Sequence, residues 1–159
     1  VEEQFLLLLS AFQRRLRWVV AFQEALIWGW WGGWVALLAA ALLKVMEASP
    51  EDLWNAPWVV LVFALCGFCW SWGRPPSLRR VALLTDTAHN LKERTVSALE
   101  QQQSWRPKTA VSAFLLQDGL RSLEAHDPAQ TFPNPWQRPL AHLLLPLALL
   151  AAVNLSPGW

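Results

Sequence analysis

Hydrophobic residues gather into three long stretches separated by polar segments. Charged residues are absent from residues 25–43, 55–73 and 139–159. A helix rises about 1.5 Å per residue, so roughly 20 apolar residues cross the hydrocarbon core of a bilayer. The pattern therefore predicts three transmembrane helices, at 25–46, 57–73 and 139–156. The third is short, and Pro146 predicts a kink within it.

The first 24 residues have the spacing of an amphipathic helix. One face carries Phe5, Leu8, Leu9, Phe12, Leu16, Val19 and Val20. The other face carries Ser10, Gln13, Arg14, Arg17 and Glu24. Such a helix is typical of a segment lying at lipid headgroups. An equally good interpretation is a cytoplasmic extension of the first span, packed on other protein.

The first span contains an unusual cluster of glycine and tryptophan. Gly29 and Gly33 lie four residues apart, one above the other on a helix, which lets another helix backbone approach closely. Trp30, Trp31 and Trp34 flank this pair and would fill the groove beside it. We predict a helix-packing site here. The alternative is that glycine is simply common in membrane helices.

The segment 74–138 is soluble in character and predicts a small helical domain. Ser77 is a candidate helix N-cap, and prolines and turn residues divide the segment. The expected helices are 78–88, 91–104 and 108–125. A proline-rich stretch, 127–139, should form an extended connector to the third span. The predicted fold class is therefore all-α, an integral membrane protein with an amphipathic helix, three spans and this domain.

The distribution of Lys and Arg gives the spans a direction. The N-terminal segment 1–24 has three and the segment 74–138 has nine, whereas the acidic loop 47–56 has none and only Lys44 borders it. Under the positive-inside rule, the N-terminus and the helical domain are cytoplasmic. The loop and the C-terminus then face outward, and the expected location is a bacterial inner membrane.

Composition supports the membrane interpretation. Hydrophobic residues make up 54% of the chain and charged residues 16%, against roughly 25% charged in soluble domains. Twelve Trp and no Tyr occur, and Trp favours the bilayer interface. The net charge of +1 predicts no nucleic-acid partner. The expected partners are lipid and other membrane proteins.

A local motif adds a family resemblance. The stretch Asp86-Thr-Ala-His-Asn-Leu-Lys-Glu-Arg-Thr-Val-Ser-Ala-Leu-Glu100 resembles the pattern D-x-x-x-G-L-K-E-R-x-x-T-A-L-E of a family of large bacterial inner-membrane proteins. The likeness continues through 125–133, as layout over most of 20–155. It implies two spans before the motif and one after. In that family a large extracytoplasmic region usually follows the third span, and its biochemical activity is not established.

The motif also has a physical interpretation. Asn90 stands where the family has Gly, and both tolerate the left-handed conformation that separates two helices. Asp86 and Arg94 flank this turn and are predicted to pair across it. Leu91, Ala98 and Leu99 are predicted to face the preceding helix, and Glu100 ends the motif. We expect a cytoplasmic helical hairpin with a structural role.

Candidate chemistry is sparse. Cys66 and Cys69 form a C-x-x-C inside the second span, where buried structural side chains are the expected role. Of the histidines, His89 falls in a turn and His126 in the connector. His142, near the cytoplasmic end of the third span, is a candidate axial ligand for chlorophyll or haem. No nucleophile–base pair or phosphate-binding loop stands out, so no enzyme activity or metal site is expected.

Three functional hypotheses remain. The leading one is a non-catalytic membrane subunit or scaffold that docks on partner membrane proteins, or on a second copy, through its Trp/Gly helices and its hairpin. A second is an accessory subunit of a photosynthetic or respiratory complex that shares chlorophyll, carotenoid or haem with a partner. A third is the membrane anchor of a sensory or envelope-maintenance protein.

Overall fold

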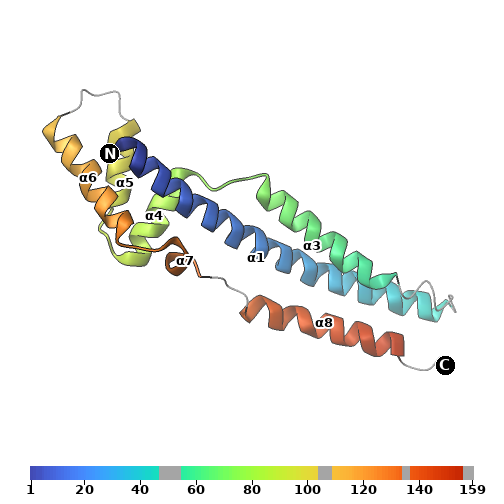
Figure 1. The fold of residues 1–159 in the computed structure, drawn as a ribbon. Coiled ribbons are helices and arrows are strands. Elements are labelled where there is room, and N and C mark those ends of the chain that lie inside the picture. Colours follow the sequence, from blue (N-terminus) through green and yellow to red (C-terminus); the bar gives the residue numbers. More distant parts are fainter. Residues whose placement is uncertain (47–54, 104–108, 134–136, 156–159) are drawn as a thin grey trace. The chain divides into compact units, whose positions relative to one another are not determined.

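A computed structural model describes residues 1–46, 55–103, 109–133 and 137–155. Every element in these ranges is a helix, which confirms the all-α fold class. In chain order the helices are α1 (Glu2–Val45), α3 (Ala56–Trp72), α4 (Leu78–His89), α5 (Arg94–Gln103), α6 (Ala110–Glu124), α7 (Pro128–Thr131) and α8 (Gln137–Leu155), as Figure 1 shows. The predicted acidic loop lies almost wholly outside the described residues.

The chain divides into two compact units. Unit 1 comprises Val1–Val19 and Pro75–Pro133, and unit 2 comprises Val20–Arg74 and Asn134–Trp159. The boundary between them falls within α1. Where the sequence pattern suggested an amphipathic helix followed by a span, the structure has one continuous helix. Residues 2–45 contain no proline, so the backbone hydrogen bonding of the helix has no reason to stop between the two patterns.

The core of unit 1 forms around the amphipathic face of α1. Phe5, Leu9, Phe12 and Leu16 are buried, and the Phe12 ring meets that of Phe132 edge-on at 6.4 Å. This face therefore packs within the chain. Its partner is the chain's own 75–133 segment, which contributes the buried side chains Val81, Val96, Leu99, Leu116, Leu120, Leu123 and Phe132.

The helices of unit 1 begin at the polar caps that their sequence supplies. The Ser77 hydroxyl accepts a hydrogen bond from the Arg80 backbone N–H, which confirms its role as N-cap of α4. Thr109 and Ser112 cap α6 reciprocally. One expectation was wrong, because the connector is not extended throughout. Asp127 caps a short helix, α7, through the Ala129 N–H.

In the part of unit 2 that the structure describes, three apolar helices pack through small residues. Its buried cluster consists of Ala36, Ala40, Ala56, Val60 and Leu150. Lys44, near the end of α1, donates a hydrogen bond of 2.9 Å to the Val153 carbonyl of α8. Pro146 lies inside α8 with its side chain fully buried. The ring therefore serves as a packing surface as well as an interruption of helix hydrogen bonding.

One of these helices is long and apolar enough to cross a membrane. This helix is α1, and only 28% of its most apolar window is buried within the chain. Helix α3 and residues 140–155 form shorter apolar helices. The surfaces of all three helices are apolar. Large side chains are exposed at Leu38 and Leu42 of α1, at Leu61, Val62 and Leu65 of α3, and at Leu144 and Leu145 of α8.

Candidate functional site

The motif of residues 86–100 forms the turn between α4 and α5. Asn90 has φ 52° and ψ 43°, the left-handed conformation predicted for it, and its N–H caps α4 through the Asp86 carbonyl. Lys92 and Glu93 also have positive φ, of 53° and 62°. Left-handed conformations are unfavourable for such side chains. The turn is therefore held in place by its surroundings rather than by local preference.

Asp86 supplies that support, in a role the sequence did not predict. Its carboxylate is buried and accepts hydrogen bonds from the backbone N–H groups of Thr95 (3.1 Å) and Val96 (3.0 Å). These groups lie in the first turn of α5, where N–H groups lack helical partners. The predicted Asp86–Arg94 pair is wrong. Arg94 instead lies 3.6 Å from Asp118 of α6.

The remaining motif residues differ in their burial and in the helices that they contact. Leu99 is buried and Leu91 is half-buried. Ala98 does not face only the preceding helix, because a Cβ built on Gly119 would lie 2.6 Å from the Ala98 Cβ. Gly119 thus lets α5 and α6 approach closely. The sequence signal that could have found this contact is a lone glycine inside the 108–125 helical pattern.

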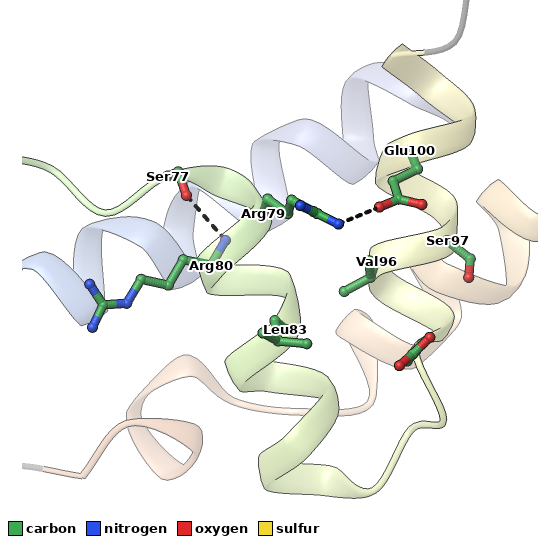
Figure 2. A pocket seen from close by; sticks show the side chains of 8 residues that line it. Ser77, Arg79, Arg80, Leu83, Val96, Ser97 and Glu100 are labelled. Atoms are coloured by element: carbon green, nitrogen blue, oxygen red, sulfur yellow. Dashed lines mark hydrogen bonds and ion pairs between the residues drawn. The ribbon is translucent and has the colours of Figure 1, made fainter.

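A groove lies between α4 and α5 in unit 1 (Figure 2). Its volume is about 580 Å³, and its lining residues are Ser77, Arg79, Arg80, Leu83, Glu93, Val96, Ser97 and Glu100. Figure 2 shows Leu83 of α4 and Val96 of α5 between the two helices, and the Arg79 guanidinium directed at Glu100. That ion pair is 3.2 Å long and exposed to solvent.

The groove combines an apolar floor with charged side chains at its rim. Leu83 is 50% exposed, so the apolar floor is open to a ligand. The rim carries the charges of Arg79, Glu93 and Glu100, whereas the Arg80 side chain is directed away from α5. The Arg79–Glu100 pair is solvent-exposed, and such pairs contribute only about 0–1 kcal/mol, so an incoming charged group can replace either partner. An apolar floor with a mixed-charge rim matches one face of an amphipathic protein segment.

A histidine pair, also unpredicted, joins the end of α4 to the segment after α6. The rings of His89 and His126 lie 3.7 Å apart and are tilted by 39°. His126 Nδ1 lies 2.7 Å from the Ser122 carbonyl, so it must donate. His89 Nε2 lies 2.8 Å from the Thr131 hydroxyl. That hydroxyl donates to the Asp127 carbonyl at 3.0 Å, so His89 Nε2 must also carry a proton.

The surroundings of His89 disfavour its protonated form. Burial, and then the neighbouring His126, lower the pKa of His89 below its usual value of 6.5. A neutral pair satisfies both hydrogen bonds described above, whereas two imidazolium rings at this separation would repel. The pair is therefore a pH-sensitive contact within unit 1. Among the described residues, no group of three or more His, Cys, Asp or Glu is placed to hold a metal ion.

The Gly/Trp cluster in unit 2 contacts the chain's own helices. Cβ atoms built on Gly29 and Gly33 would lie 3.5 Å from Ala64 and 3.0 Å from Pro146. Two further glycines, which the sequence analysis missed, make closer contacts: Gly32 would meet Phe63 at 2.7 Å, and Gly67 would meet Trp28 at 2.6 Å. The predicted close approach exists, and it is intramolecular. This glycine face is thus already occupied.

The other predicted residues of unit 2 lie on its surface. Trp30 packs edge-on against Trp31 (4.8 Å) and Trp34 (6.3 Å), so the indoles pack on one another, and Trp31 is exposed. Cys66 and Cys69 are exposed rather than buried as expected. His142 is exposed on α8. A pigment or haem ligated there would need enclosure by another chain.

Comparison with known proteins gives no relative. No family model, no curated protein and no solved structure matches the chain.

Proposed function

We propose that this chain is a non-catalytic, membrane-anchored adaptor that binds a partner protein segment in the groove between α4 and α5. The groove carries the proposal, because its floor is apolar and open while its rim offers both signs of charge. Docking is assigned to unit 1 because the glycine faces of unit 2 are occupied by the chain's own side chains.

The proposal places unit 2 in a bacterial inner membrane as three spans. The apolar surfaces of α1, α3 and α8 support this placement, because large exposed aliphatic side chains are stable in lipid and costly in water. Unit 1 and the N-terminus are then cytoplasmic, on the side favoured by Lys and Arg. Helices α3 and α8 are short, and the helix contacts at Gly32 and Gly33 would hold them upright.

The exposed cysteines of α3 test the membrane placement. A membrane-impermeant maleimide should leave Cys66 and Cys69 unlabelled in intact membranes, because lipid would cover them. Labelling should become complete in denaturing detergent. Rapid labelling in intact membranes, together with release of the protein by alkaline carbonate, would contradict the placement.

Site-specific photocrosslinking tests the groove. A photoreactive amino acid at Leu83 should give a discrete protein adduct in cells, because this residue forms the groove floor. Val111 of α6 is the matched control, since it is also exposed and apolar but does not line the groove. Absence of an adduct at Leu83, or the same adducts at both positions, would refute groove binding.

A further inference from the structure

Five arginines gather at one end of unit 1. On α1, Arg14, Arg15 and Arg17 are the only charged residues between Glu3 and Glu24. Arg79 and Arg80 lie in the first turn of α4. These five residues, the arginine end of unit 1, come from segments far apart in the sequence.

Hydrogen bonds hold these segments together. Gln13 Nε2, next to Arg14, donates to the Pro76 carbonyl at 2.7 Å, directly before the α4 N-cap. Arg15 Nε donates to the Phe132 carbonyl at 3.2 Å. The chain leaves unit 1 at three points, each within a few residues of these contacts. The arginine end is therefore the end from which all connections to unit 2 depart.

Two of the arginines have no ion-pair partner within the described part of the chain. Arg79 pairs with Glu100, whereas Arg14 and Arg80 are exposed and have no ion-pair partner among the described residues. Figure 2 shows the Arg80 side chain directed away from α5. A positive charge in the first turn of a helix opposes the helix dipole. Arg80 thus carries a cost that an external anion would offset.

We propose that the arginine end binds the headgroups of anionic phospholipids. The inference rests on the proposed placement of unit 2 in a bilayer, because the three chain connections would then bring this end to the membrane surface. Guanidinium groups match phosphate oxygens in a bidentate geometry. Trp18, which follows Arg17, is 46% exposed and has the amphipathic ring that favours the headgroup region.

Binding of lipid headgroups would also orient unit 1. Bound headgroups would fix the height and tilt of unit 1 above the bilayer, and so the direction in which the α4–α5 groove faces the cytoplasm. Because Arg79 belongs both to the arginine end and to the groove rim, lipid composition would also alter the charge that a partner meets there.

Native mass spectrometry of the full chain in detergent tests this inference. The measured quantities are the dissociation constants of the first bound phosphatidylglycerol and the first bound phosphatidylcholine. Each arginine near an anionic surface contributes about fivefold in affinity. The double variant Arg14→Gln/Arg80→Gln should therefore bind phosphatidylglycerol about 25-fold more weakly. Its phosphatidylcholine constant should stay within about twofold.

The matched control is Lys92→Gln/Arg121→Gln, which removes the same charge from the α4–α5 turn and from α6. This control should retain the wild-type preference, and equal weakening in both double variants would overturn the proposal. Inorganic phosphate added at constant ionic strength should not displace phosphatidylglycerol, and displacement under this condition would indicate a site for the free anion instead.

Two further measurements distinguish failure of the lipid-binding inference from failure of the proposed membrane placement. Should the arginine variant fail to fold, rising ammonium acetate must still weaken wild-type binding of phosphatidylglycerol and leave phosphatidylcholine unaffected. A chain that needs detergent for extraction but shows no lipid preference contradicts this inference alone. A chain that alkaline carbonate releases from membranes contradicts the membrane placement itself.

Discussion

Replacing Asp86 with asparagine tests whether this side chain must accept two hydrogen bonds at once. The carboxylate uses Oδ1 for the Thr95 N–H and Oδ2 for the Val96 N–H. Asparagine has the same shape but only one oxygen. Its amide NH₂ group would therefore face one of the two backbone donors, and Thr95 and Val96 are both buried from water.

The expected cost follows from the lost bond and the donor left unpaired. These are two measures of the same loss: a hydrogen bond to a charged group contributes about 1.5–3 kcal/mol, and leaving its buried donor unsatisfied costs about 1–3 kcal/mol, so each donor that loses its acceptor costs about 2 kcal/mol. We expect Asp86→Asn to lower the free energy of unfolding by about 2 kcal/mol, and Asp86→Ala by about 2–4 kcal/mol. For a chain of this size, 2 kcal/mol lowers Tm by about 4–8 °C.

Thermal unfolding of the full chain in detergent at pH 7, followed by circular dichroism, measures these values. Amide hydrogen exchange at Thr95 and Val96 then localises the change to the start of α5. Asp127→Asn is the matched control, because Asp127 is exposed and its side chain caps α7 through the Ala129 N–H alone. We expect its Tm to fall by less than about 2 °C.

The reasoning would be refuted by a different pattern of losses. If Asp86 acted mainly as a charge partner for Arg94, Arg94→Ala would destabilise the chain as much as Asp86→Ala. An unchanged Tm in Asp86→Asn would show that a single acceptor is enough. Either result would remove the carboxylate from its role as the cap that holds the left-handed turn.

Two other predictions concern packing and pH in unit 1. Gly119→Ala places a methyl group 2.6 Å from the Ala98 Cβ, and we expect a loss of about 1–3 kcal/mol in urea unfolding. That loss should become clearly smaller in an Ala98→Gly background, where the 3.3 Å approach to the Phe5 ring remains, and an undiminished loss there would exclude the Ala98 contact as the cause. The pKa of His89 is lowered in the folded chain by burial and His126, so the unfolded chain binds the proton more strongly. The contribution of neutral His89 to the free energy of unfolding should therefore be fully present above about pH 6.5 and be lost as the pH falls below that value. His89→Gln should flatten the dependence of Tm on pH between 5 and 8, and an unchanged slope would contradict the assignment.

Local features of unit 1 were predictable from the sequence. Ser77 precedes α4 as a cap because its hydroxyl meets an N–H three residues away, and Asn90 is left-handed because its own backbone preference permits it. Both depend on neighbours within one helical turn. Helix boundaries near prolines were predictable for the same reason, as at Pro57 in the first turn of α3.

Contacts between distant segments were not predictable. Asp86 stands near Arg94 in sequence, and opposite charges suggested a pair. Asp86 instead accepts hydrogen bonds from backbone N–H groups at the start of α5. The position of those groups depends on how α5 begins after the turn, and no local sequence pattern specifies that start. The His89–His126 pair depends on the length and direction of α6. In unit 2, Gly29 and Gly33 were found by spacing, whereas Gly67 acquires its role only from Trp28.

The shared helix α1 has a consequence for biosynthesis. Its first residues form the core of unit 1 with a segment that ends at Pro133, so they must wait until most of the chain has left the ribosome. Throughout this interval Phe5, Leu9 and Phe12 have no native partner and remain a hydrophobic helix face open to chaperones or to aggregation. Unit 1 therefore closes late, after α1 and α3 have been made. A stalled chain whose residues before Pro133 are still inside the ribosomal tunnel would have a protease-sensitive N-terminus, and emergence of the chain up to Pro133 from the tunnel would protect it.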